Sequence, residues 1–217
     1  MDQILLHHAG LPADGDAARA VAPRGSDTGL RVTRPARRRN PRARLESLLG
    51  LALLVDCARA TGRLPPGPED LESTARGKPR WKGGPDFSIS HAGGRVACAL
   101  VAGRGCVGLD IEPYDAVSAE DLRVVATAAE IEQFGAEGLG PADLWTTKES
   151  VIKAAGATVA AIDRVAATPF RARFDGVDYL LLRATLVPGL ACTLATRGPA
   201  CLSVAHVDAR QVLARLG

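Results

Sequence analysis

The spacing of hydrophobic residues predicts several helices along the chain. Residues 46–62 (ESLLGLALLVDCARATG) carry apolar side chains at helical spacing and end on a glycine, where a helix C-cap would lie. Residues 118–135 and residues 145–156 (WTTKESVIKAAG) also predict helices, and the first of these is expected to break near Thr127. The connection at 63–86 is rich in proline and glycine, which predicts an irregular segment.

Strands are predicted in the middle and at the end of the chain. The segments FSISH (87–91) and RVACALVA (95–102) flank Ala-Gly-Gly, which is typical of a β-hairpin with glycine in the turn. Residues 163–208 indicate further strands, including YLLLRATLV and ACLSVAHV. A strand–helix–strand pattern that occurs twice predicts an α+β fold. We expect an N-terminal half at 1–105 and a C-terminal half at 106–217.

Composition narrows the class of protein. The 217 residues are 47% hydrophobic, which is enough for one substantial core or two small fused ones. There is no run of about 18 apolar residues, so we expect no membrane span. The start of the chain lacks the features of a secretory signal. The five cysteines are odd in number and form no Cys-x-x-Cys, which favours a reduced, cytoplasmic protein without disulfides or a zinc site.

Positive charge is concentrated in one stretch. Residues 31–44 (RVTRPARRRNPRAR) contain seven arginines and no acidic residue, within a net charge of +3. The stretch is either a solvated basic segment or a surface for phosphates or an acidic protein, because arginine matches both groups geometrically. A nucleic-acid-associated protein would interleave aromatic residues with the basic ones, and this stretch has none.

Two carboxylates lie close together on one predicted strand. Residues 106–113 (CVGLDIEP) alternate, so Asp110 and Glu112 share the polar face, with Cα atoms about 6.6 Å apart. Two such groups repel unless a cation lies between them, and oxygen ligands suit Mg²⁺. The alternative is a polar strand face that ends at the loop after Pro113.

The helix at 145–156 carries a second charged pair. Glu149 and Lys153 are four residues apart and therefore neighbours on the helix surface. A surface ion pair worth about 0.3–0.5 kcal/mol is one explanation. Trp145, Ile152 and Gly156 lie near the same side, which favours a partly buried wall of a site.

A third group of polar residues lies at the predicted hairpin. Ser90 and His91 precede Ala-Gly-Gly, and Lys78 lies upstream in the sequence GKP. A hydroxyl, an imidazole and exposed backbone N–H groups beside a lysine could hold a phosphate. A lone histidine is more often structural.

The chain resembles the 4′-phosphopantetheinyl transferases in four stretches. VGLDIEP (107–113) followed by WTTKESVIKAAG (145–156) is similar to the two-part signature of that family. GKP (77–79) and FSISHAGG (87–94) are similar to its surfactin-synthetase-type branch, as is the length of the chain. The resemblance implies two similar α/β halves related by a pseudo-two-fold, with coenzyme A bound between them. It also implies a monomer.

The resemblance further implies a reaction and a set of site residues. The phosphopantetheine arm of coenzyme A moves to a serine of an apo acyl or peptidyl carrier protein, with Mg²⁺ or Mn²⁺ bound. Asp110, Glu112 and Glu149 are the implied metal ligands, and Glu149, Lys153 and Asp110 the implied catalytic residues. The implied coenzyme A contacts are Lys78, Pro79, Ser90, His91, Lys148, Lys153 and Arg44.

Some parts of the chain depart from the family pattern. The first 45 residues show no family pattern, the register of Arg44 is open, and the segment after Gly156 lacks a second glycine. None of these departures touches the three acids, so transfer activity is the favoured function. The alternative is an inactive homologue that binds coenzyme A or a nucleotide. The carrier and its pathway do not follow from the sequence.

Overall fold

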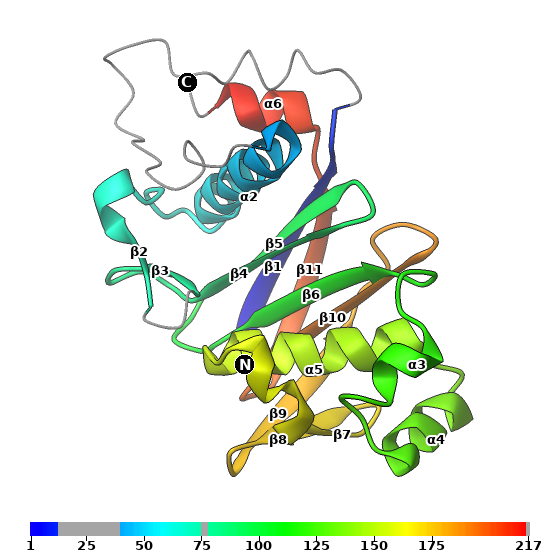
Figure 1. The fold of residues 1–217 in the computed structure, drawn as a ribbon. Helices are drawn as coiled ribbons and strands as arrows, with labels where there is room; N and C mark the ends of the chain where they lie inside the picture. The colour runs from blue at the N-terminus through cyan, green and yellow to red at the C-terminus, as the bar shows by residue number, and fades with distance from the viewer. Residues whose placement is uncertain (13–39, 75–77, 216–217) are drawn as a thin grey trace.

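The computed structural model describes residues 1–12, 40–74 and 78–215, and the fold is α+β. Two larger sheets lie side by side, and helices cover their outer faces (Figure 1). A small hairpin of β2 and β3 lies beside them. The bounds of these two short strands are Leu71–Ser73 and Pro79–Trp81.

The first sheet contains four strands in the order β11-β1-β5-β4. Their bounds are Ala200–His206 for β11, Asp2–Gly10 for β1, Arg95–Val101 for β5 and Phe87–Ala92 for β4. Strand β1 pairs antiparallel with β5 and parallel with β11. Helices α2 (Pro41–Ala60) and α6 (Ala209–Ala214) pack on one face of this sheet, where leucines of α2 meet alternate side chains of β1 and β5.

The second sheet contains five strands in the order β6-β10-β9-β8-β7. Their bounds are Gly108–Pro113, Leu190–Thr196, Val177–Arg183, Arg171–Phe174 and Ala166–Ala167. Helix α5 (Pro141–Ala155) crosses one face of the sheet, and α3 (Ala119–Leu122) and α4 (Ala128–Ala136) pack nearby. Two 3₁₀ helices, Pro68–Asp70 and Val159–Arg164, complete the elements of the described residues.

A buried apolar layer joins the two sheets. Ile4 and Leu6 of β1 belong to one cluster with Leu109 and Ile111 of β6. The alternation of β6 places these two side chains on the inner face, so Asp110 takes the opposite face toward α5. The expected alternation at 106–113 is therefore confirmed.

Polar side chains join the edge strands of the two sheets. Strands β4 and β6 are each at the edge of their sheet, so each presents unpaired backbone groups. Three side chains, at every second position along β4 and the residues just before it, accept hydrogen bonds from backbone N–H groups. These N–H groups lie at every second position along β6 and the residue just before it. These bonds are Val107 N to Asp86 Oδ2 at 2.9 Å, Leu109 N to Ser88 Oγ at 2.9 Å, and Ile111 N to Ser90 Oγ at 3.4 Å.

Several elements lie where the hydrophobic pattern placed them. The hairpin turns at Gly93 and Gly94, whose φ angles of 55° and 72° are in the left-handed region that suits glycine. The helix expected at 118–135 is broken as predicted, and Thr127 caps the start of α4. Helix α5 is capped at its end by Gly156, with a φ angle of 63°, as expected, but it begins at Pro141 and not at residue 145.

Other expectations need correction. Helix α2 begins at Pro41 instead of residue 46, because Asn40 caps it by accepting from the N–H groups of Arg42 and Ala43. The connection at 63–86 contains the short hairpin of β2 and β3. The division into halves at 1–105 and 106–217 stays a prediction, although β11 and α6 of the second half pack with the first sheet.

Candidate active site

Close packing of α5 on β6 creates the central part of the site. A Cβ atom at Gly108 would lie 1.8 Å from the backbone oxygen of Ser150 and 2.4 Å from the backbone nitrogen of Ala154. Only glycine lets the helix approach the strand this closely. As a result, Lys153 of the helix reaches Asp110 of the strand.

Asp110 is the most enclosed acid of this group, with 3% of its surface exposed. Its Oδ1 atom accepts hydrogen bonds from Lys153 Nζ at 2.5 Å and from Ser90 Oγ at 2.9 Å. Its Oδ2 atom is buried and has no hydrogen-bond partner among the described residues. One oxygen is therefore held by the protein, and the other is a buried acceptor without a partner among the described residues, which is unusual in folded proteins.

Glu112 and Glu149 complete an acidic cluster around Asp110. Burial raises the pKa of the Glu112 carboxyl, as do the nearby charges of Asp110 and Glu149, while Lys153 lowers it. Burial and Asp110 likewise raise the pKa of the Glu149 carboxyl, and Lys153 opposes them. The charges of Asp110 and Lys153 therefore act on both glutamates.

The cluster fits a hard divalent cation in charge and ligand type. All the candidate ligand atoms are carboxylate oxygens, and Oδ2 of Asp110 is buried without a hydrogen-bond partner among the described residues. Within the described residues, however, no three His, Cys, Asp or Glu side chains are arranged to hold a metal ion. In this conformation the ammonium group of Lys153 provides the positive charge next to Asp110.

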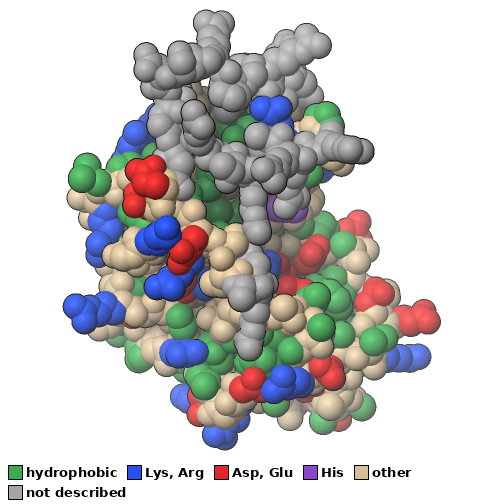
Figure 2. Space-filling view, turned by 60° about the vertical axis from the view of Figure 1, so that its left-hand side comes forward, with side chains coloured by type: hydrophobic (Ala, Val, Ile, Leu, Met, Phe, Trp, Pro, Cys, Tyr) green, Lys and Arg blue, Asp and Glu red, His purple; other side chains and the backbone are tan. Residues whose placement is uncertain are grey.

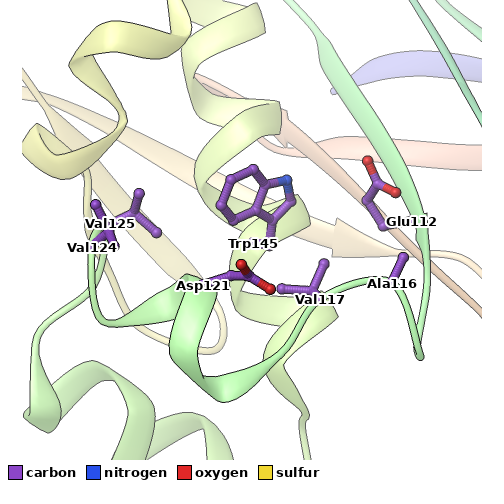
Figure 3. Close-up of a pocket in the computed structure, with 7 residues that line it drawn as sticks. All are labelled: Glu112, Ala116, Val117, Asp121, Val124, Val125 and Trp145. Atoms are coloured by element: carbon purple, nitrogen blue, oxygen red, sulfur yellow. The ribbon is translucent and has the colours of Figure 1, made fainter.

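A pocket of about 370 Å³ opens beside Glu112. Trp145 of α5 stands between Val124 and Val125 on one side and Glu112 on the other (Figure 3). Val117, Ala116 and Asp121 complete the lining. Figure 2 shows acidic side chains gathered among hydrophobic ones on the right-hand side of the molecule. The pocket therefore joins an apolar wall to the edge of the carboxylate cluster.

Lys148 lies apart from this cluster, and its expected contact with coenzyme A stays a prediction. Its side chain is 1% exposed, and Nζ donates to Glu130 Oε1 at 2.8 Å and to the carbonyl oxygen of Val165. Glu130 also accepts from the backbone N–H groups of Thr127 and Ala167. Lys148 therefore joins α5 to α4 and to the start of β7.

Lys78 is also engaged within the protein. Its Nζ atom donates to Asp86 Oδ2 at 2.8 Å and to the carbonyl oxygen of Val107 at 3.2 Å. Two of the three ammonium donors are thereby used, which leaves one for a phosphate. Pro79, the first residue of β3, is exposed.

His91 and Arg44 lie on neighbouring elements, near the start of α2. The His91 side chain is 43% exposed, and its Nδ1 atom lies 3.5 Å from Glu46 Oε2. Glu46 also accepts from Arg42 Nε at 3.2 Å. Arg44 lies in the first turn of α2, and its Nε atom is buried without a hydrogen-bond partner among the described residues. Residues 31–39 of the arginine stretch lie outside the described residues.

Sequence reasoning missed the internal partners of these lysines. The position of Glu130 could be predicted in part. Thr127 and Glu130 are three residues apart, which is the spacing of a capping box, and the structure contains this capping box. Asp86 had no signal of its own, because its contact with Lys78 depends on how the hairpin folds back. Trp145 was expected on a partly buried wall, and it lines the pocket.

Comparison with known proteins gives a family match for one segment of the chain. No curated protein matches the chain. In the described structure no helix is long and apolar enough to cross a membrane. The segment that contains Asp110, Glu112, Glu149, Lys153 and the pocket is the one that a protein family matches. Residues 106–191 match ACPS, the 4′-phosphopantetheinyl transferase superfamily, and this match supports that superfamily for the chain.

Proposed function

We propose that this protein transfers the 4′-phosphopantetheine arm of coenzyme A to a serine of an apo acyl or peptidyl carrier protein. The products are the holo carrier and adenosine 3′,5′-bisphosphate. The observation that carries the proposal is the contact of Lys153 with Asp110, beside Glu112 and Glu149, within the segment that the superfamily matches. Coenzyme A and the carrier protein are the partners that this superfamily implies.

The residues of the cluster suit each part of this reaction. The serine hydroxyl oxygen of the carrier attacks the β-phosphorus of coenzyme A, and the bond from that phosphorus to the bridging oxygen breaks. Glu149 accepts the hydroxyl proton. Lys153 offsets the charge that develops on the phosphoryl oxygens, where a fixed ammonium is most effective. Mg²⁺ or Mn²⁺, held by Asp110, Glu112 and Glu149, would supply further positive charge at the pyrophosphate.

We further propose that the protein belongs to the surfactin-synthetase-type branch and acts as a monomer. GKP at 77–79 and FSISHAGG at 87–94 support the branch. The two neighbouring sheets, each covered by a long helix, agree with two halves related by a pseudo-two-fold. In this arrangement His91 and the free donor of Lys78 bind the nucleotide phosphates.

The pocket beside Glu112 suits the chain attached to the reacting phosphate. Its apolar lining favours an uncharged chain of carbon, amide and sulfur atoms, and Glu112 lies at the end nearest the carboxylate cluster. We propose that the pantetheine arm lies against Trp145.

A second function is a coenzyme A-binding module without transfer activity. One observation favours it: Lys153 pairs with Asp110, and the described acids do not form a three-ligand metal site. The two functions differ in whether a carrier becomes modified.

The test is incubation with coenzyme A, Mg²⁺ and apo carrier proteins from fatty acid, polyketide and nonribosomal peptide systems, followed by intact mass spectrometry. We expect one phosphopantetheine on one serine of at least one carrier. EDTA should abolish the transfer, and Mg²⁺ or Mn²⁺ should restore it. Binding of coenzyme A without modification of any carrier would support the module instead, and transfer that survives chelation would contradict the metal-dependent reaction.

A further inference from the structure

Three basic side chains lie together at one end of the first sheet. His8 of β1 is paired with His206 of β11, and the centroids of their rings are 5.1 Å apart. Arg95, the first residue of β5, is paired with Gly10, which lies two residues beyond His8. Residues two apart on a strand share a face, as do residues paired across strands, so all three side chains lie on one face of the sheet. We call His8, Arg95 and His206 the basic cluster.

The basic cluster lies apart from the expected contacts with coenzyme A. Ala97, two residues after Arg95, belongs to the apolar layer between the two sheets, so the cluster lies on the face toward that layer. His91 is paired with Val96, which packs in the cluster of residues under α2. His91 and Arg95 therefore lie on opposite faces of the first sheet.

Two nitrogen atoms of the basic cluster are buried without partners. His8 is 3% exposed, and its Nδ1 atom makes no hydrogen bond to any residue that the structure describes. The same holds for the Nη1 atom of Arg95. Buried polar atoms in folded proteins nearly always have a partner, so two such atoms in one cluster indicate a ligand that accepts hydrogen bonds.

The charges around His8 favour an anion as this ligand. Burial, together with the positive charges of His206, Arg95 and His7, lowers the pKa of His8 to about 4. A metal cation would add to this repulsion, whereas an anion would offset it. A neutral imidazole can carry its proton on Nδ1, so His8 can donate a hydrogen bond without becoming charged.

The arrangement of the donors suits a phosphate group. A Cβ atom at Gly10 would lie 3.8 Å from Cζ of Arg95, so the guanidinium of β5 extends over β1 on the face that carries His8. A guanidinium matches the oxygens of a phosphate with two parallel N–H groups. His206 is exposed, which leaves the cluster accessible from the side of β11.

We propose that His8, Arg95 and His206 form an anion site that binds a phosphate group, separate from the site of the transfer reaction. The phosphate is either the free ion or part of a larger molecule, since the cluster recognises the same oxygens in both. The proposal goes beyond the proposed function and does not depend on whether a carrier is modified.

The experiment is a titration with inorganic phosphate, followed by the NMR signals of the histidine rings, in EDTA and at an ionic strength held constant with chloride. The chain has four histidines, and His8→Leu and His206→Asn assign the two signals of the cluster. We expect both signals to shift with phosphate in the wild type. A shift confined to His91 would place the ion at the expected nucleotide contacts and would overturn the proposal, as would the absence of any shift.

Arg95→Gln has a matched control in Arg104→Gln, which removes the same charge from an exposed position after β5. Arg95→Gln should weaken phosphate binding at His8 by about 10- to 100-fold, as expected for loss of a charge-assisted hydrogen bond. Arg104→Gln should bind phosphate as the wild type does. Equal affinities in the two variants would overturn the proposal.

Two further measurements test the independence of the site and the state of His8. Calorimetry should give the same coenzyme A affinity for Arg95→Gln and the wild type, and a selective loss in Arg95→Gln would make the cluster part of the coenzyme site. His8→Leu should melt no lower than the wild type when phosphate is absent, because the Nδ1 atom that it removes has no bond to lose. Added phosphate should then raise the melting temperature of the wild type and leave that of His8→Leu unchanged. An equal rise in both proteins would contradict the assigned site.

Discussion

The Nζ atom of Lys153 lies 2.5 Å from Oδ1 of Asp110, across the interface between α5 and β6. The lysine side chain is 29% exposed and that of the aspartate 5%, so the pair extends from solvent into the protein. Lys153 is consequently placed to neutralise an acid within the protein and to meet an anionic substrate from outside.

Asp110→Asn should abolish most transfer activity while the protein stays folded. The substitution keeps the shape of the side chain and removes the charge that Lys153 and a cation would share. We expect a loss in turnover of about 100-fold, as for other groups that act on transition-state charge. Folding should persist because the change relieves repulsion with Glu112 and Glu149.

Intact-mass kinetics at saturating Mg²⁺ provides the measurement, with circular dichroism as the check on folding. Asp115→Asn is the control, since Asp115 is exposed on the loop after β6. Turnover of Asp110→Asn near the wild-type rate would mean that the acid cluster does not carry the chemistry.

Lys148→Met should affect stability and leave substrate binding unchanged. The change removes one member of a buried ion pair and leaves the carbonyl of Val165 without its donor. Breaking such a pair costs about 3–5 kcal/mol in the free energy of unfolding. We expect the lower end of this range, because Glu130 keeps its bonds from Thr127 and Ala167.

Urea unfolding measures the stability, and calorimetry measures coenzyme A affinity at a temperature where the variant is folded. Lys82→Met, at an exposed ion pair with Glu72, is the control and should cost no more than about 1 kcal/mol. Weaker coenzyme A binding by the folded Lys148→Met variant would show that Lys148 contributes to coenzyme A binding.

Glu130 should make the stability of the protein depend on pH in the acid range. Burial opposes ionisation, but hydrogen bonds from Lys148, Thr127 and Ala167 outweigh it and hold the pKa of this carboxyl below its usual 4.5. The folded state therefore binds a proton less readily than the unfolded state. The contribution is complete above pH 4.5 and is lost as pH falls through the folded-state pKa.

Urea unfolding at several pH values from 6 downward, at matched ionic strength, checks this dependence. Glu130→Gln should be less stable than the wild type above pH 4.5, and the difference should narrow as pH falls. Glu132→Gln changes an exposed acid of the same helix and should follow the wild type. A constant difference between Glu130→Gln and the wild type at every pH would contradict the prediction.

His91→Ala should separate binding of the nucleotide end from the chemistry. By resemblance, His91 lies near the 3′-phosphate of coenzyme A, and its half-exposed side chain beside Glu46 agrees with access from solvent. A charge-assisted hydrogen bond there would contribute about 1.5–3 kcal/mol, or about ten- to hundredfold in affinity. Dephospho-coenzyme A lacks this phosphate and should bind the variant as it binds the wild type. Calorimetry with both ligands is the measurement, and equal losses would indicate a structural histidine.

The positions of several turns and helix ends could be predicted from the sequence, because each is determined by residues that are close together in the chain. The hairpin at Gly93, the cap at Thr127 and the end of α5 at Gly156 all follow from residues a few positions away. The shared face of Asp110 and Glu112 follows from strand alternation alone. For these features the local chemistry agrees with the final fold.

The roles of single polar residues were harder to predict, because their partners are distant in sequence. Lys148 follows the family pattern. It also lies on the same side of α5 as the buried residues Leu144, Val151 and Ile152, and this spacing was a signal that its side chain is buried. The contacts of Ser90 with Asp110 and Lys153 likewise depend on how β4 meets β6 and α5, which no local pattern shows. The pairing of β1 with β11 has no local signature at all.

That pairing bears on how the protein folds during synthesis. Asp2 pairs with Ala200, so β1 emerges from the ribosome long before β11 can join it. Until then β1 has β5 as its only neighbouring strand and presents an open edge that other chains could pair with. Contacts of such long sequence separation slow folding, since the intervening chain must be ordered first. We therefore expect the second sheet, whose strands lie between residues 108 and 196, to form before the first is complete.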